Sequence, residues 1–88
     1  MHKFEIKPEL EKKLVKLSKK DKSRYESMMS KISEILNSSD IEHYKNIRYD
    51  MKESKRAHIG HFVLIFGYDK IRDFISFEDY DHRDNIYK

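Results

Sequence analysis

Cysteine is absent from the sequence, glycine occurs twice and proline once, and each scarcity excludes a class of site. Without cysteine the chain has no disulfides, no thiolate metal ligands and no thiol nucleophile, which suits a reducing compartment. Two glycines cannot form a phosphate-cradling loop, and no Gly-x-Ser-x-Gly turn presents a serine nucleophile. Nucleotide hydrolysis and serine hydrolysis are therefore not expected.

Long hydrophobic runs are also missing. No stretch approaches the roughly 20 apolar residues of a membrane span, and residues 1–6 lack the apolar segment of a signal peptide. We therefore expect a cytoplasmic protein that does not associate with membranes. The 88 residues are 38% hydrophobic and 40% charged, and a chain this short cannot bury two independent cores, so one domain over residues 1–88 is expected.

The start of the chain predicts a strand and a helix. Apolar and charged residues alternate between His2 and Lys7, which is the period of a half-buried strand. Pro8 follows, with a backbone angle suited to the first turn of a helix. A helix from about Pro8 to Lys19 is predicted because leucines recur at spacings of four and three, at Leu10, Leu14 and Leu17.

A second helix is predicted after Asp21, which can accept a hydrogen bond as its N-cap. The apolar residues of this helix recur at helical spacing, at Tyr25, Met28, Met29, Ile32, Ile35 and Leu36. Only a few polar residues around Lys20–Lys22 separate the two helices, which favours an antiparallel hairpin with both apolar stripes facing one way. The polar cluster Asn37–Asp40 ends the second helix.

From Ile47 onward the period changes to two, which predicts a sheet. A continuous apolar run after Gly60 indicates a central strand covered on both faces. The predicted strands are Ile47–Lys52, Lys55–Ile59, Phe62–Phe66 and Ile71–Tyr80, with turns at Glu53–Ser54, Gly60 and Asp69–Lys70, and a tail Asp81–Lys88 that has room for one helical turn. The predicted class is α+β: an N-terminal strand and an antiparallel helical hairpin packed on one face of a mostly antiparallel sheet of about five strands.

Histidines are the first chemical signal, because imidazole transfers protons near neutral pH. Four of the five lie in or just before the C-terminal half, at His43, His58, His61 and His82. None of them forms a His-x-x-x-His or His-Glu-x-x-His pair, and no cysteine can complete a site. Neither a metal ion nor another cofactor is therefore expected.

A second signal is the gathering of rings and cations in two segments. Arg56 and His58 alternate onto one face of a strand, and the tail Tyr80–Tyr87 collects further histidine, arginine and tyrosine. Metal-free RNA cleavage needs proton transfers at the 2′-hydroxyl and the 5′-oxygen, which imidazole can perform, and a guanidinium to neutralise the phosphate. Stacked tyrosines can hold unpaired bases. By residue type alone, an ordinary solvated sheet face, with Tyr87 plugging the edge of the core, explains the pattern better.

The chain resembles the RelE/ParE toxin superfamily, in particular archaeal RelE-like members, over nearly its whole length. The element order is similar, and so are three stretches of sequence, Lys55–Gly60, Phe62–Phe66 and Asp81–Tyr87. The last stretch is the most specific, because it is similar to the family's His-Arg-x-x-x-Tyr ending. His82, Arg83 and Tyr87 stand at the expected separations.

The resemblance implies a toxin of a type II toxin–antitoxin system, a metal-independent endoribonuclease (mRNA interferase) that cuts messenger RNA on the ribosome. It implies two kinds of partner: messenger RNA with the ribosome, and an acidic RelB-like antitoxin that suits the formal net charge of +3. Together with the side-chain chemistry, it predicts a catalytic set of Arg56, His58, His82, Arg83 and Tyr87, and an RNA-binding set of Arg48, Lys52, Lys55 and Tyr80.

Two positions depart from the family's pattern. A frequent arginine on the strand after the glycine turn is Val63 here, and an additional tail arginine of some members is Asp81. Either Arg48, Lys52 or His82 supplies the missing function, or activity is weak or lost. Two alternatives stay open: a ParE-type toxin that inhibits DNA gyrase by binding it, and a degenerate member that only binds its antitoxin. Catalysis in any form requires the predicted strand and tail residues to meet in one open groove.

Overall fold

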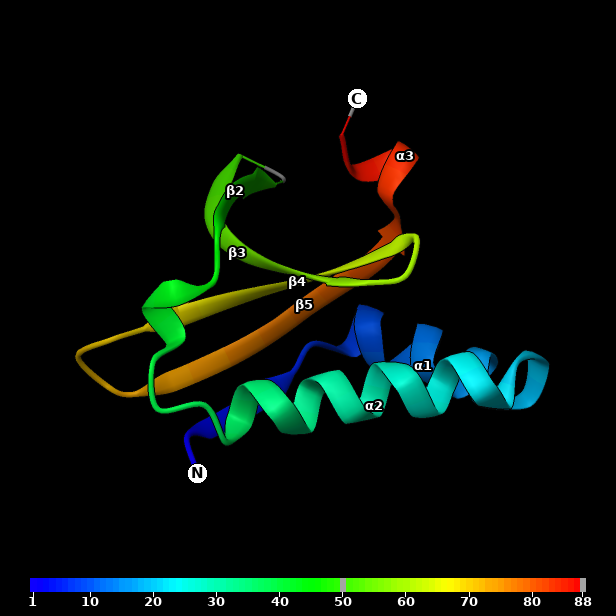
Figure 1. Ribbon diagram of the computed structural model, residues 1–88, viewed down its shortest axis with the longest axis horizontal. Coiled ribbons are helices and arrows are strands. Elements are labelled where there is room, and N and C mark those ends of the chain that lie inside the picture. The colour runs from blue at the N-terminus through cyan, green and yellow to red at the C-terminus, as the bar shows by residue number, and fades with distance from the viewer. Residues whose placement is uncertain (50, 88) are drawn as a thin grey trace.

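Two antiparallel helices lie against one face of a twisted sheet in the computed structural model (Figure 1), which describes residues 1–49 and 51–87. The helices are α1 (Pro8–Lys20) and α2 (Lys22–Leu36), and a 3-10 turn follows at Ile41–His43. The strands are β1 (Lys3–Ile6), β2 (Asn46–Tyr49), β3 (Lys52–Ile59), β4 (Phe62–Asp69) and β5 (Phe74–His82), and the short helix α3 (Arg83–Ile86) follows β5. The predicted helical hairpin and the helical turn in the tail are confirmed.

The two long helices form where the local sequence favours them. Pro8 occupies the first turn of α1, where its missing N–H is not needed, and lysines in the last turn complement the helix dipole. Asp21 begins α2 by accepting a hydrogen bond from the Arg24 backbone N–H at 3.1 Å, as its predicted N-cap role requires. Within residues 1–49 and 51–87, none of the helices combines the length and the hydrophobicity of a membrane span. The buried residues of the two helices are Leu10, Leu14, Leu17, Met28, Ile32, Ile35 and Leu36.

The strands of the sheet follow the order β1-β5-β4-β3-β2. All neighbouring pairs are antiparallel except β1 and β5, which run parallel with Lys3 opposite Phe74. The first strand in sequence thus extends the sheet beside the last one. The predicted mostly antiparallel sheet of five strands, and with it the α+β class, is confirmed.

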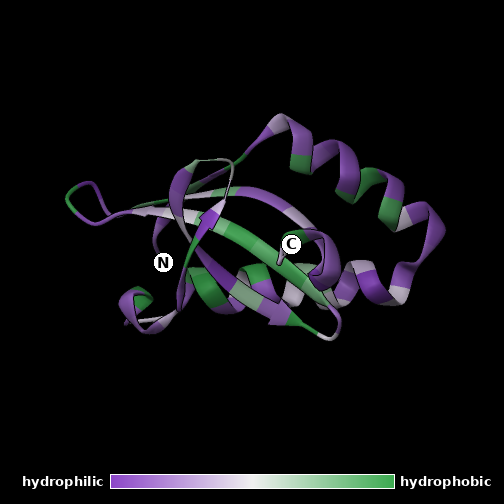
Figure 2. Ribbon diagram, turned by 90° about the horizontal axis from the view of Figure 1, so that it is seen from above, coloured by the Kyte–Doolittle hydropathy of each residue, from purple (hydrophilic) through white to green (hydrophobic). Residues whose placement is uncertain are grey.

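Strand β4 lies in the middle of the sheet and carries its most apolar segment (Figure 2). Residues 63–66 are fully buried although successive side chains of a strand point to opposite faces. Leu64 and Phe66 join the core beneath α1 and α2. Val63 and Ile65 face the other side, where α3 packs against β4 and β5 (Figure 1). The predicted central strand covered on both faces is confirmed.

The β2–β3 hairpin turns earlier than the sequence indicates. The last residue of β2 pairs with the first residue of β3, so Glu53 and Ser54 lie inside β3. The prediction of a turn at Glu53–Ser54 is wrong because the Ser54 side chain is buried and its hydroxyl donates to the Glu78 carboxylate of β5 at 3.1 Å. The hydrogen bond to Glu78 thus keeps Ser54 in the sheet, although serine is a residue type typical of turns. Asp50, placed in a strand by the sequence pattern, lies outside the described residues.

The last strand begins at Phe74 rather than at the predicted Ile71. Ile71 is 97% exposed, and residues 70–73 form the turn between β4 and β5. The Asp69 carboxylate accepts a hydrogen bond from the Arg72 backbone N–H at 3.2 Å, which stabilises a turn where the pattern predicts a strand. At its other end β5 continues to His82, beyond the predicted end of the strand.

Candidate functional site

Two rows of side chains cross the sheet on the face opposite α1 and α2, which we call the open face. Each row takes one residue from β3, β4 and β5: Arg56, Ile65 and Asp79 in the first row, and His58, Val63 and Asp81 in the second. Residues directly opposite one another in neighbouring strands project to the same side of a sheet. The open face therefore changes from basic on β3, through apolar on β4, to acidic on β5.

Tyr87, in the tail after α3, contacts both basic residues of β3. Its hydroxyl lies 3.4 Å from Nε2 of His58, and the two rings stack with centroids 6.1 Å apart at an angle of 24°. The guanidinium carbon of Arg56 lies 5.3 Å from the centroid of the Tyr87 ring, a cation–π contact. Three of the predicted catalytic residues thus meet on the open face. We call these three residues the Arg56 cluster.

Arg56 carries a charge that its surroundings leave available. Within the described part of the chain its Nε atom is buried and has no hydrogen-bond partner. Nearly all buried donors in folded proteins are paired, so this nitrogen is an exception, and the Arg56 guanidinium forms no ion pair with the residues that the structure describes. Carboxylate and phosphate groups are the acceptors that fit the guanidinium fork best. The cluster can therefore hold an anion beside two groups that transfer protons.

The short helix α3 places Tyr87 over β3. Nδ1 of His82 accepts a hydrogen bond from the Asp84 backbone N–H at 3.2 Å and so caps the helix. The Arg83 backbone N–H donates to the His61 carbonyl at 2.8 Å, which ties the start of α3 to the β3–β4 turn. The Tyr87 N–H in turn donates to the Arg83 carbonyl at 2.9 Å. Backbone hydrogen bonds thus hold the tail against the sheet.

The other two predicted catalytic residues lie outside the Arg56 cluster. The His82 ring stacks on His61, with centroids 6.1 Å apart at 13°, and meets Phe62 edge-on at 5.4 Å. Phe62 in turn contacts Arg24, so His82 lies near the first turn of α2. Arg83 is exposed on α3, and its side chain has no hydrogen-bond or ion-pair partner among the residues described.

The predicted RNA-binding residues are likewise divided between surfaces. Lys52 lines a groove on the open face. Arg48 projects to the outer side of the hairpin, where it forms an exposed ion pair with Glu53 at 3.5 Å. Tyr80 belongs to the side of the sheet that faces the helices, and the Lys13 ammonium lies 5.6 Å from its ring centroid.

Lys55, the fourth predicted RNA-binding residue, is buried on the side of β3 that faces away from the Arg56 cluster. Its ammonium donates to Oδ1 of Asn46 at 3.0 Å and to the Tyr44 carbonyl at 3.3 Å. The charge of Lys55 thus holds the segment that leads into β2. Alternation along β3 separates Lys55 from Arg56, but alternation alone does not tell which of the two faces the open side.

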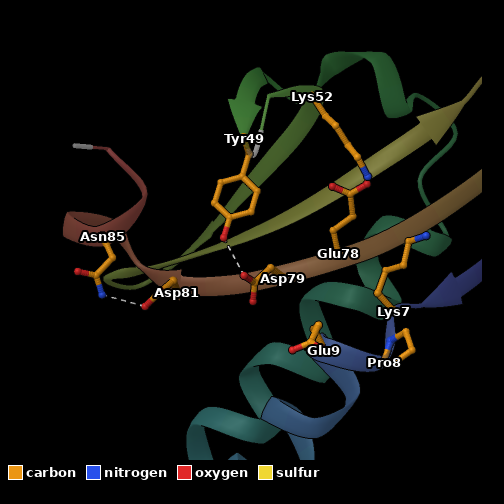
Figure 3. A pocket seen from close by; sticks show the side chains of 9 residues that line it. All are labelled: Lys7, Pro8, Glu9, Tyr49, Lys52, Glu78, Asp79, Asp81 and Asn85. Atoms are coloured by element: carbon orange, nitrogen blue, oxygen red, sulfur yellow. Dashed lines mark hydrogen bonds between the residues drawn. The ribbon is translucent and has the colours of Figure 1, made fainter.

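An open groove of about 880 Å³ lies on the β5 side of the rows (Figure 3). The β2–β3 hairpin forms one wall, the start of α1 forms the other, and β5 runs between them. Its lining is Lys7, Pro8, Glu9, Tyr49, Lys52, Glu78, Asp79, Asp81 and Asn85. Four carboxylates and two ammonium groups therefore line this groove, although no set of three or more side chains suited to a metal ion is found within residues 1–49 and 51–87.

Hydrogen bonds fix the acids of this groove. Asp79 accepts from the Lys13 ammonium and from the Tyr49 hydroxyl, both at 2.7 Å, and so joins α1, β2 and β5. Asp81 accepts from the Asn85 side-chain amide at 3.0 Å, and this bond is the main reason that the pKa of Asp81 lies below its ordinary value. Asp81 is therefore an anion at neutral pH.

These acids cannot be recognised as a group from the sequence pattern. A bulge in β5 opposite Ile65 and Phe66 inserts Glu78 as an extra residue, so strict alternation fails at this point. Only the acidic composition of residues 78–81 could have signalled the groove.

No protein-family model matches the chain. A Methanocaldococcus jannaschii protein named "Putative toxin RelE4" is nevertheless 44% identical to it over 89 residues, which cover 100% of this chain and 93% of the relative. The similarity therefore extends from end to end.

Two solved structures are similar in fold. A chain of the archaeal RelE–RelB complex from Pyrococcus horikoshii OT3 matches with a TM-score of 0.72 and 15% identity, over 93% of this chain and 94% of its own length. A chain of the toxin–antitoxin complex RelBE2 from Mycobacterium tuberculosis matches with a TM-score of 0.62 and 15% identity, over 93% and 98%. Because one relative is 44% identical over the whole length of this chain, and the fold is shared with RelE structures, the chain belongs to the RelE family of toxins.

Proposed function

We propose that this protein is an endoribonuclease that cleaves messenger RNA, with Arg56, His58 and Tyr87 as its reacting groups. The observation that carries the proposal is the contact between the tail and β3, which sets a tyrosine hydroxyl 3.4 Å from an imidazole nitrogen and its ring over an arginine. Cleavage by the neighbouring 2′-hydroxyl needs two proton transfers and one group that stabilises negative charge. The Arg56 cluster supplies all three on one exposed face.

In the proposed reaction the scissile phosphate lies against the Arg56 guanidinium. The 2′-oxygen bonds to phosphorus as its proton passes to His58, and the bond from phosphorus to the 5′-oxygen breaks as Tyr87 donates a proton to that oxygen. The products are a 2′,3′-cyclic phosphate and a free 5′-hydroxyl. The proton on His58 then returns to Tyr87 across the same contact. At 3.4 Å this contact is long, and catalytic hydrogen bonds of this kind shorten when substrate binds.

Two partners follow from this proposal. The similar structures are complexes of RelE with RelB, which supports a RelB-like antitoxin for this chain, and we propose that it is acidic because the toxin has a formal net charge of +3. The ribosome is the proposed place of cleavage. Carboxylates outnumber cations in the open-face groove, so free RNA should bind there weakly, and a ribosome that presents the messenger would offset that repulsion.

The test is cleavage of a defined messenger on translating ribosomes, with the cut positions mapped from the new 5′ ends. Wild-type protein should cut, and Arg56→Ala should not. Arg48→Ala is the matched control, because it removes the same charge from the outer side of the neighbouring strand. If the two variants cut equally well, the Arg56 cluster is not the site of cleavage.

One observation favours a second candidate, a family member that binds its antitoxin without cutting RNA. Val63 and Asp81 stand where the family's pattern has arginines, and they face each other in the same row as His58. Replacing two cations by an apolar and an acidic residue lowers the affinity of the row for phosphate. Growth of cells that express the chain without an antitoxin separates the candidates, because only an active toxin should arrest it.

A further inference from the structure

A second concave surface lies beside the helical hairpin. This basic cleft of about 490 Å³ runs between the α1–α2 turn and the ends of β4 and β5. Four cationic side chains and two carboxylates line it, which leaves an excess of positive charge. Its lining is Lys13, Lys16, Leu17, Lys20, Asp21, Arg24, Phe62, Tyr80 and Asp81.

Two of the four cations have no ion-pair partner. Lys13 pairs with Asp79 at 2.7 Å, and Arg24 pairs with Asp21 at 3.3 Å. Lys16 and Lys20, by contrast, are exposed and form no ion pair with the residues that the structure describes. They are four residues apart on α1 and therefore lie on the same side of the helix. Two free ammonium groups side by side suit an anion that carries more than one charge.

The floor of the basic cleft is aromatic. The rings of Phe62 and Tyr80 lie 5.9 Å apart at 57°, and the Arg24 guanidinium carbon is 4.4 Å from the Phe62 centroid. Rings interleaved with cations are the surface that binds single-stranded RNA, because bases stack on rings while cations neutralise phosphates. A cleft built only to attract an acidic protein segment needs the cations but not the rings.

The basic cleft and the Arg56 cluster lie on opposite faces of the sheet, near the same end of β4. Phe62 on the cleft floor immediately precedes Val63, which lies opposite His58. His82 meets Phe62 edge-on and also caps the helix that carries Tyr87. An RNA strand that spans both sites must therefore cross from one face of the sheet to the other near the β3–β4 turn and the start of α3.

We propose that the basic cleft binds the RNA segment that flanks the cut, with Lys16 and Lys20 on its phosphates and a base against the Phe62–Tyr80 floor. The proposal rests on the RNA-cleaving function proposed above and adds a second subsite to it. Short substrates should engage only the Arg56 cluster, whereas longer ones should also gain the affinity of the cleft.

The test measures binding of a fluorescent single-stranded RNA of about 12 nucleotides, long enough to cover both sites, at several salt concentrations. Tyr87→Phe serves as the background, so that the RNA is not cut during the measurement. The cleft variant is Lys16→Gln with Lys20→Gln. The matched control is Lys12→Gln with Lys19→Gln, which removes the same charge from α1 at exposed positions outside the cleft lining.

The cleft variant should weaken binding by about tenfold and reduce the slope of log K against log salt by about 1.4, since each lost phosphate contact on a single strand contributes about 0.7. The control should change the affinity and the salt slope much less. A dinucleotide should bind the background protein, the cleft variant and the control with the same affinity. Phe62→Leu, which keeps an apolar floor without the ring, should also weaken binding of the long RNA.

Three outcomes would contradict the proposal that the basic cleft binds RNA. Equal losses in the two lysine pairs would mean that only the overall charge matters. Unchanged RNA binding by the cleft variant would exclude the subsite. If the cleft variant bound RNA normally but lost binding to the antitoxin, the cleft would be assigned to the antitoxin instead. Failure of the proposed cleavage looks different, because wild-type protein would then bind long RNA through the cleft and leave the messenger on translating ribosomes uncut.

Discussion

The hydroxyl of Tyr87 and Nε2 of His58 lie 3.4 Å apart although the two residues are 29 positions apart in the sequence. Their contact depends on α3, because the His82 cap and the hydrogen bond to the His61 carbonyl orient the tail. The proposed chemistry therefore requires both the sheet register and a four-residue helix.

Tyr87→Phe removes only the hydroxyl and keeps the ring over Arg56. If Tyr87 donates a proton to the leaving oxygen, single-turnover cleavage should slow by about 10²- to 10⁴-fold while RNA affinity is unchanged. Tyr25→Phe, on α2 and away from the open face, should cut at the wild-type rate. A Tyr87→Phe protein as fast as wild type would leave the tyrosine a stacking role alone.

Arg56→Lys keeps the positive charge but loses the planar fork and its stacking on Tyr87. We expect cleavage to fall by about 10²-fold, the usual effect of removing one donor to the developing charge, because an ammonium cannot reproduce bidentate contact with phosphate. The same exchange at Arg48 is the control. Retention of activity in Arg56→Lys would show that charge alone is sufficient.

Stability should depend on the protonation of His2 at the other end of the sheet. Its Nδ1 lies 2.5 Å from the Asp73 carboxylate and its Nε2 lies 2.6 Å from the Ser38 carbonyl, so the ring donates to both only when it is charged. The hydrogen bond to Ser38, and then the one to Asp73, raise the pKa of His2 above 6.5. The stabilisation is therefore complete below the unfolded pKa and is lost as the pH rises through the folded one.

Urea unfolding at a series of pH values above about 5, where aspartate is ionised, checks this expectation. The free energy of unfolding should decrease with rising pH in the wild type and vary less in His2→Gln. His43→Gln, on the 3-10 turn, leaves the His2–Asp73 contact intact and should keep the wild-type slope. Parallel slopes for wild type and His2→Gln would refute the role of His2.

Gly67 gives room to the Glu78 carboxylate. A Cβ at this position would lie 3.2 Å from Oε2 of Glu78, whose other oxygen accepts from the buried Ser54 hydroxyl. Gly67→Ala should therefore push the carboxylate away from Ser54 and destabilise the fold by about 1 kcal/mol, the usual value of one hydrogen bond. In a Glu78→Ala background the same change should cost little, so a double-mutant cycle measured by urea unfolding should show coupling. Additive effects would contradict the argument.

The helices and most of the sheet are predictable because their signals are local. Pro8, the Asp21 cap and the spacing of the leucines define the helical hairpin within one segment each. The His-Arg-x-x-x-Tyr ending likewise lies in one stretch, so the resemblance to the family does not depend on any tertiary contact. The errors at Ser54 and Ile71 arise where a partner from another segment, or a turn stabilised by a side chain, competes with the strand pattern.

The sequence by itself determined the element types, the α+β class and the set of aromatic and cationic residues that are available to form a site. Only the tertiary structure decided which of them meet. Alternation along β3 defines two faces, and the packing of the helices against one of them turns Lys55 inward and leaves Arg56 on the open side. Register between strands, together with the extra residue in β5, then sets acids opposite the cations. These are long-range relationships, and no single segment carries their signature.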